Sequence, residues 1–175
     1  MKNILLDIRI ESKDKAMNVE IRLAEIQELS LIYEFYRVVC TALENEIYTP
    51  LWQIDNYPCI EDIKNHINNE DMYIAIYDNQ IVGAMAIANH NDYSSVHLLT
   101  VHPDYRKQHL AESMIKKLFQ IADERKNHKI ILDVVKDNLP AEKLYNKFGF
   151  EFTGEKYELI ERIGNVCFNT YEYLT

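Results

Sequence analysis

The sequence predicts one α/β (α+β) domain with a mixed central sheet of about six to seven strands flanked by helices. Residues 72–77 and 81–90 are apolar runs joined by a short polar stretch, which is typical of an antiparallel hairpin. A helical pattern at residues 110–125 separates strand-like runs at 94–102 and 129–135, which is typical of a parallel crossover. A sheet with both connections is mixed.

The start of the chain is expected to differ from the rest. Residues 1–18 predict an N-terminal extension or tail, because residues 11–18 are polar, and the domain is expected to span residues 19–175. An ordered extra strand formed by residues 4–10 is the alternative. Met17 is a candidate natural start, since a strand-like run follows it directly.

Three further stretches predict helices. Residues 24–45 carry apolar side chains at helical spacing and predict a helix or a helix pair. Pro50 and Pro58 oppose its continuation, and residues 60–69 then predict a short helix with acidic residues in its first turn. Residues 110–125 show the clearest amphipathic pattern, with one apolar stripe and charged residues off it.

The last third of the chain alternates strand, helix and strands. Residues 129–135 are apolar without alternation, which indicates a strand buried on both faces. Asn138 and Pro140 then begin a short helix, and Gly149 ends it. The remaining residues predict two strands joined near Gly164.

Composition excludes several classes of protein. The chain has 175 residues, 47% of them hydrophobic and 27% charged, which fits a globular domain. Its formal net charge of −9 argues against binding to nucleic acid or to an anionic membrane. The 3 cysteines are widely spaced, so buried inert thiols are expected in place of disulfides or zinc ligands. No signal peptide or membrane-spanning run is evident, and a cytoplasmic protein without a metal is expected.

Residues 100–114 predict a turn from a strand into a helix that could bind an anion. The first N–H groups of a helix have no intrahelical acceptor and lie at the positive end of its dipole. Arg106 and Lys107 add positive charge, and Ala111 permits close approach. On these features alone, an ordinary solvated helix start is the favoured interpretation.

Two motifs resemble the GNAT N-acetyltransferase superfamily. The stretch LTVHPDYRKQHLAESMI, residues 99–115, is similar to its acetyl-CoA-binding motif through Arg106 and Ala111, with His109 in place of the middle glycine. The stretch DNLPAEKLYNKFGF, residues 137–150, is similar to its downstream segment. Residues 50–58 resemble a segment between the early helices of some bacterial members. The resemblance covers roughly residues 19–174.

The resemblance implies a sheet with splayed parallel strands and acetyl-CoA (coenzyme A) as the cofactor. It places main-chain groups of Leu99, Thr100 and Val101 against the pantetheine arm, and Asn138, Ala141 and Tyr145 beside that arm and the thioester. It assigns the pyrophosphate to residues 106–111, namely Arg106, Lys107, Gln108, His109, Leu110 and Ala111. We expect binding despite His109, provided that its φ is negative or its side chain points away from the phosphates.

Acetyl transfer to an amine requires a neutral amine, a stabilised oxyanion and a proton for the departing thiolate. The resemblance implies that Tyr145 supplies this proton, while core packing is the alternative role. No general base is evident. His97, expected on one strand face with Leu99 and Val101, and Asp133 in the buried strand are candidates. Structural roles for both, or deprotonation through water, remain open.

The acceptor site is expected to contain Trp52 and Tyr57 from a proline-bounded loop and Tyr171 and Tyr173 from the last strand. The resulting hypothesis is an acetyl-CoA-dependent N-acetyltransferase that acts on a primary amine of a small molecule or peptide, as a monomer or homodimer. The alternative is a catalytically degenerate acyl-CoA-binding or regulatory module on the same fold.

Overall fold

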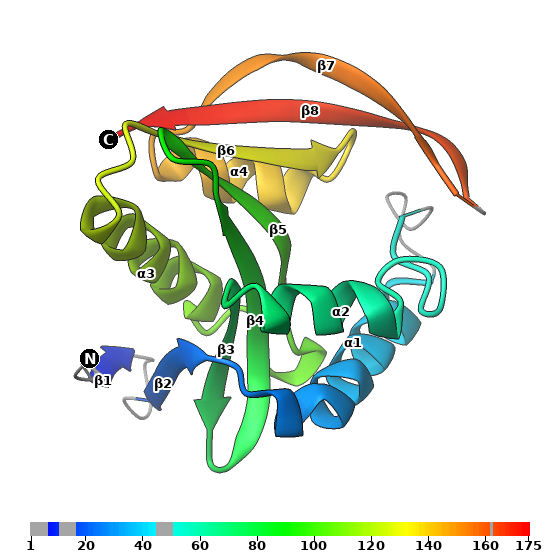
Figure 1. The fold of residues 1–175 in the computed structure, drawn as a ribbon, viewed down its shortest axis with the longest axis vertical. Helices are drawn as coiled ribbons and strands as arrows, with labels where there is room; N and C mark the ends of the chain where they lie inside the picture. Colours follow the sequence, from blue (N-terminus) through cyan, green and yellow to red (C-terminus); the bar gives the residue numbers. More distant parts are fainter. Residues whose placement is uncertain (1–6, 11–16, 45–50, 162) are drawn as a thin grey trace.

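The computed structural model describes residues 7–10, 17–44, 51–161 and 163–175 of the chain. Its eight strands form one sheet in the order β1-β2-β3-β4-β5-β6-β8-β7 (Figure 1). The strands are β1 Asp7–Ile10, β2 Met17–Leu23, β3 Met72–Tyr77, β4 Gln80–Asn89, β5 Tyr93–Val101, β6 Lys129–Val135, β7 Glu151–Ile160 and β8 Gly164–Leu174. The helices are α1 Leu29–Leu43, α2 Ile60–Asn68, α3 Leu110–Glu124 and α4 Leu139–Lys147, with short 3-10 turns at Ile26–Glu28 and Pro103–Tyr105.

The expected mixed sheet is confirmed. All neighbouring strands pair antiparallel except β5 and β6, which are parallel and joined through α3. The sheet has one strand more than the upper expectation because residues 7–10 pair with β2 as an edge strand. The expectations for residues 11–16 and for Pro50 lie outside the described residues.

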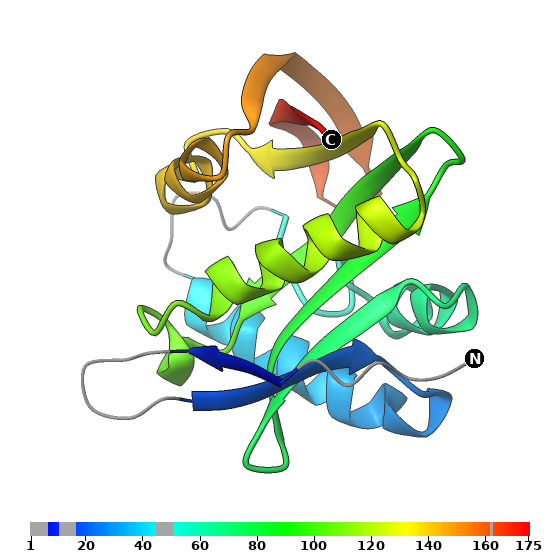
Figure 2. The ribbon, with the colours of Figure 1, turned by 90° about the vertical axis from the view of Figure 1, so that its left-hand side faces the viewer.

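Helices cover both faces of the sheet. Figure 2 shows α3 lying across one face while α1 lies behind the strands. The core on the α3 side includes Met114, Leu118, Ile130 and Leu132. The core on the other face joins α1 and α2 to β3 and β4. Both amphipathic patterns therefore bury their apolar stripes, as the sequence predicts.

The parallel strands β5 and β6 separate after only four residue pairs, the last of which joins Val96 to Leu132. From there β5 stays paired with β4 up to Val101, while β6 stays paired with β8 up to Val135. Residues 97–101 and 133–135 therefore present facing strand edges that have no ladder between them in the described structure. We call this opening the notch. It confirms the splayed parallel strands expected from the sequence.

A β-bulge shapes the β5 side of the notch. The β4–β5 register passes from Ala86 opposite His97 to Ala84 opposite Thr100, so β5 carries one extra residue. Leu98 lies in this bulge with φ +56. The buried hydroxyl of Tyr36 on α1 donates a hydrogen bond of 2.8 Å to the Leu98 carbonyl. Helix α1 therefore holds the strand irregularity that borders the notch.

Tyr36→Phe tests this contact. The substitution leaves the Leu98 carbonyl buried without its donor, so the free energy of unfolding should fall by about 1–3 kcal/mol. Urea unfolding followed by circular dichroism measures the loss. Tyr33→Phe removes an exposed hydroxyl from the same helix, one that bonds Asp55, and should change stability by less than about 0.5 kcal/mol. Equal losses in the two variants would show that Tyr36 does not hold the bulge.

Candidate active site

Three adjoining cavities follow the notch from the start of α3 to the far side of the sheet. An outer cavity of about 470 Å³ lies at the turn before α3, between residues 105–112 and Pro140. A middle cavity of about 230 Å³ shares Val101, Arg106 and Ala111 with it. An inner cavity of about 190 Å³ shares Trp52 and Tyr145 with the middle cavity. The shared walls make one path along the notch.

The turn before α3 has the backbone conformation of an anion-binding nest. Lys107 and His109 have φ of +60 and +61, and the left-handed His109 directly precedes the right-handed residues of α3. Alternation of left-handed and right-handed residues turns successive N–H groups into one concavity. The first N–H groups of α3 add to it, since they have no intrahelical acceptor. Arg106, Lys107 and Ala111, to which the resemblance assigns the pyrophosphate, line the outer cavity.

The φ of His109 is opposite in sign to the first expected condition, and the residue lines the outer cavity together with Glu112. Its φ is not negative, because the residue occupies the left-handed N-cap position that glycine normally takes. Its side chain turns to α3, where Nδ1 lies 2.9 Å from Glu112 Oε1. Lys147 Nζ lies 2.7 Å from the same Glu112 oxygen, and these hydrogen bonds, first from Lys147 and then from His109, lower the pKa of Glu112. The imidazole is thereby tied to a carboxylate.

The middle cavity brings the two sequence motifs together. Leu99, Thr100 and Val101 line one wall, and Asn138, Ala141 and Leu144 line the other. Asn138 begins α4, since its Oδ1 accepts a hydrogen bond of 3.3 Å from the Ala141 N–H. Within the described residues, the Thr100 hydroxyl is buried without a hydrogen-bond partner. A buried polar atom of this kind suits a ligand that carries amide groups.

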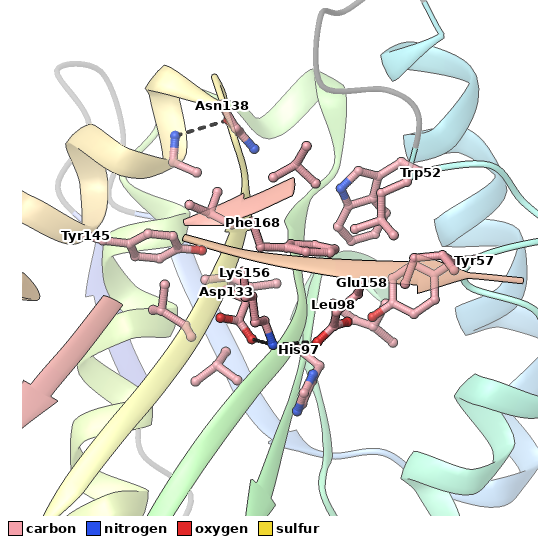
Figure 3. Close-up of a pocket in the computed structure, with 18 residues that line it drawn as sticks. Trp52, Tyr57, His97, Leu98, Asp133, Asn138, Tyr145, Lys156, Glu158 and Phe168 are labelled. Atoms are coloured by element: carbon pink, nitrogen blue, oxygen red, sulfur yellow. Dashed lines mark hydrogen bonds and ion pairs between the residues drawn. The ribbon is translucent and has the colours of Figure 1, made fainter. Parts of the chain in front are cut away.

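The inner cavity has an aromatic wall and a tyrosine hydroxyl facing each other. Figure 3 shows the Tyr145 hydroxyl directed into the cavity, with Trp52 and Tyr57 on the opposite side. Trp52 stacks on Tyr36, with ring centroids 6.3 Å apart, and meets Tyr57 edge to face. Burial raises the pKa of Tyr145, so its hydroxyl keeps its proton at neutral pH. The Tyr145 ring also packs in the α3-side core, which is the alternative role that the sequence offered for it.

Charged groups of the inner cavity form an ion-paired cluster. Asp133 accepts a hydrogen bond of 2.7 Å from the Thr170 hydroxyl and pairs with Lys156 at 2.5 Å. Lys156 also pairs with Glu158 at 2.6 Å. Burial lowers the pKa of Lys156, but the hydrogen bonds to Asp133 and Glu158 outweigh it and leave the pKa raised. Asp133 is therefore bound to a side-chain hydroxyl and a cation.

His97 lines the inner cavity, but the expected face is wrong. Leu99 and Val101 pack on the α3 side of the sheet. His97 instead stacks on His66 of α2, with ring centroids 5.9 Å apart. The bulge at Leu98 explains the difference, because one extra residue reverses the alternation of side chains along β5.

The expectation that Tyr171 and Tyr173 line the acceptor site is also wrong. Both pack in the α3-side core, Tyr171 against Tyr145 and Tyr173 against Phe119. The terminal hairpin reaches the inner cavity with Phe168, Lys156 and Glu158 instead. Phe168 lies an odd number of residues from Tyr171, so strand alternation places it on the opposite face. These three residues reach the cavity because of the order of the strands in the sheet, and no motif in the sequence points to them.

Other expected features concern the rest of the chain. Cys40 is buried, and burial raises the pKa of its thiol to about 11, while Cys59 and Cys167 are half-buried. In the described ranges, no three His, Cys, Asp or Glu side chains gather so that they could hold a metal ion. None of the helices in the described part of the chain is long and apolar enough to span a membrane.

Comparison with known proteins identifies the family. The model of the acetyltransferase (GNAT) family matches residues 38–150, which is well over half of the chain. The chain belongs to the GNAT family of acetyltransferases. This match contains both motifs and the splayed strands between them.

Individual relatives are distant. The candidate ribosomal protein bS18-alanine N-acetyltransferase of Bacillus subtilis (strain 168) is 24% identical over 134 residues, covering 75% of this chain and 80% of that protein. The ribosomal-protein-S18-alanine N-acetyltransferase structure from Escherichia coli superposes with a TM-score of 0.70 at 14% identity, covering 89% of this chain and 93% of that one. A GNAT acetyltransferase from Elizabethkingia anophelis with acetyl-CoA bound has a TM-score of 0.67 at 15% identity, covering 90% of this chain and 99% of that one. These structures share the fold of this chain.

His109→Gly and His109→Ala test the backbone conformation of the turn before α3. Both variants lose the bond to Glu112, but only glycine adopts the positive φ without strain, so His109→Gly should be more stable by about 1 kcal/mol. Thermal and urea unfolding measure the difference. Gln108 is absent from the residues with positive φ, so Gln108→Gly should be less stable than Gln108→Ala. The same order at both positions would contradict the left-handed conformation of His109.

Proposed function

We propose that this GNAT acetyltransferase transfers an acetyl group from acetyl-CoA to a primary amine of a small molecule or peptide. The observation that carries the proposal is the continuous path along the notch. It joins an anion-binding turn at its outer end to a protonated tyrosine and an aromatic cavity at its inner end.

The residues present fit coenzyme A. The N–H groups of residues 107–111, with Arg106 and Lys107, suit a pyrophosphate. The free edge of β5 and the buried Thr100 hydroxyl offer hydrogen bonds to a chain with amide groups. Leu99, Ala141 and Leu144 supply apolar contacts along the same cavity. Bound there, acetyl-CoA supplies an activated acetyl thioester.

The chain's own residues provide the remaining chemistry. Tyr145 projects a protonated hydroxyl into the inner cavity and would donate that proton to the departing sulfur. Backbone N–H groups along the unpaired edge of β5 would stabilise negative charge on the acyl oxygen. Trp52 and Tyr57 would position the acceptor on the opposite side and keep bulk water away from the reacting atoms.

Two considerations favour a peptide or small amine as the acceptor. The relatives named above from Bacillus subtilis and Escherichia coli carry names that describe alanine N-acetyltransferases of ribosomal protein S18. The inner cavity, at about 190 Å³, has room for a small side chain or for the end of a chain. A degenerate acyl-CoA-binding module would also bind acetyl-CoA in the notch, so turnover with an amine distinguishes the two functions.

Calorimetric titration with acetyl-CoA tests the proposed function first, with desulfo-CoA and ATP as controls. Acetyl-CoA and desulfo-CoA should bind with micromolar affinity, since both contain pyrophosphate and pantetheine, while ATP should bind at least tenfold more weakly. Screening small amines and alanine-terminated peptides for acetylation by mass spectrometry follows. Binding without any acetylation would support the degenerate module, and no binding of either CoA form would refute the proposed site.

Tyr145→Phe tests the acid. Loss of the hydroxyl should lower kcat on the order of 10²-fold while the Kd of acetyl-CoA changes less than about threefold, because a proton donor acts mainly in the transition state. Stopped assays and calorimetry measure both values. Tyr171→Phe removes a neighbouring hydroxyl outside the cavity and should keep wild-type kcat. Unchanged turnover by Tyr145→Phe would remove its assigned role.

Asn138 is tested with a pair of variants, because it caps α4 and also lines two cavities. Asn138→Ala should lose about 1 kcal/mol of stability and weaken acetyl-CoA binding or slow transfer. Asn138→Asp keeps the cap acceptor but replaces the amide donor with negative charge. If Asn138→Asp retains stability and still impairs binding or transfer, the amide contacts the ligand. Full activity of Asn138→Asp would confine the residue to capping.

A further inference from the structure

A hydrogen-bonded chain leads from the inner cavity to the surface along the β4–β5 hairpin. His97, which lines the cavity, has its Nε2 2.9 Å from the Ser95 hydroxyl oxygen. The same oxygen lies 2.7 Å from Nε2 of His90, an exposed residue at the end of the hairpin. His90 is held there by stacking on Tyr93, with ring centroids 4.5 Å apart. Each step is short enough for direct proton transfer.

His97, the residue of this hydrogen-bonded series that lines the cavity, has one ring nitrogen that could accept a proton. His97 Nε2 is used by Ser95, while Nδ1 has no hydrogen-bond partner among the described residues. Asp133, the other titratable base candidate, is bound by Thr170 and Lys156. His97 therefore lines the inner cavity with one ring nitrogen uncommitted, whereas both carboxylate oxygens of Asp133 have partners.

The groups around His97 keep it neutral. His66 of α2 stacks on its ring, Asp71 follows that helix, Asp133 faces it from β6, and His90 lies on its own hairpin. Lys156 of β7 lines the same cavity. Burial first and His66 second lower the pKa of His97, against the opposite effect of Asp133 and Asp71. A neutral imidazole can accept a proton at pH 7.

We propose that His97, Ser95 and His90 form a proton relay that carries the proton of the acceptor amine from the inner cavity to solvent. The proposal rests on the proposed N-acetyl transfer and adds the route by which the amine is deprotonated. Only His97 touches the acceptor. Ser95 and His90 act through it.

The relay moves the excess proton of an acceptor that enters as an ammonium ion. The second amine proton, released during acetyl transfer, replaces the proton that Tyr145 gives to the thiolate, so no charge stays in the cavity. The amine N–H bond breaks as His97 Nδ1 takes the proton, and the Nε2 proton of His97 passes to the Ser95 oxygen. The original Ser95 hydroxyl proton passes to His90 Nε2, and His90 releases a proton from Nδ1 to water. The relay thus disposes of the proton at the surface during acetyl transfer. After product release, water that enters the emptied cavity takes the Nδ1 proton of His97, and a solvent proton returns through His90 and Ser95 to Nε2, so one proton in total passes to solvent per turnover.

His66 acts as a positioning residue in this arrangement. Its Nδ1 lies 2.8 Å from Asp71, a buried carboxylate, and its ring stacks on His97 at an interplanar angle of 26°. The stacked ring limits rotation of the His97 imidazole. It therefore keeps Nε2 aligned with Ser95.

Kinetics of Ser95→Ala and His90→Gln test the relay in a weakly buffered solution at pH 7. Both variants should lower kcat on the order of tenfold, less than the roughly 10²–10⁴-fold contribution of a group that transfers the proton directly. Added imidazole buffer should restore kcat in His90→Gln, where only the outermost acceptor is missing. His128→Gln changes an exposed histidine that is not part of the relay, and its kcat should match that of wild type with and without imidazole. Wild-type kcat in both relay variants, or a loss that imidazole does not restore in His90→Gln, would overturn the relay.

Nitrogen NMR of the histidine rings tests the relay without turnover. The relay requires neutral His97 to carry its proton on Nε2 with Nδ1 unprotonated, and ¹⁵N shifts of the wild-type protein distinguish the two tautomers. A proton on Nδ1 would overturn the relay even in an active enzyme. If wild type binds acetyl-CoA but acetylates no amine, the proposed function fails. The tautomer of His97 then still decides whether the relay is arranged to conduct a proton outward.

Discussion

The site depends on one constraint, the early end of the ladder between the parallel strands β5 and β6. Each strand stays paired on its outer side, β5 to β4 and β6 to β8, so the sheet remains intact while the inner edges separate. Unpaired backbone groups at this depth would be costly in a closed core. They are tolerated here because the notch opens into cavities that a ligand or water can fill. The bulge at Leu98, held by Tyr36, shapes one edge of that opening.

The helices on either side of the notch make the opening chemically useful. Helix α3 begins at its outer end and contributes N–H groups, while α4 begins beside it with Asn138 as the cap. The two helix starts come from motifs that lie about 30 residues apart in sequence, and the crossover through β6 brings them to the same cavity. The start of α3 presents its N–H groups and α4 carries Tyr145, so the notch positions both the proposed binding site and the proposed acid.

Much of this arrangement could be predicted from the sequence because it rests on local patterns. The stripe of α3, the continuous apolar run of β6 and Gly149 after α4 each have a short-range signal, and each element lies where its pattern places it. The two motifs, residues 99–115 and 137–150, pointed to four residues that line the cavities: Arg106, Ala111, Asn138 and Tyr145. The failures share a different cause. An extra residue at Leu98 reverses the strand faces, and the insertion of β8 between β6 and β7 decides which side chains of the hairpin reach the cavity. Pairing between distant strands sets both, so no local pattern reveals them.

The charges of the inner cavity bear on which form of the acceptor it can use. An ammonium group entering a cavity with two free carboxylates would be strongly stabilised and would resist deprotonation. Here Lys156 already pairs with both Asp133 and Glu158, so an incoming amine meets carboxylates that are largely neutralised. Desolvation then favours the uncharged amine. In the proposed mechanism, an amine that arrives as an ammonium ion loses its proton inside the cavity. Because Asp133 is occupied, the path from His97 through Ser95 to His90 is the proposed exit, and it ends at an exposed side chain.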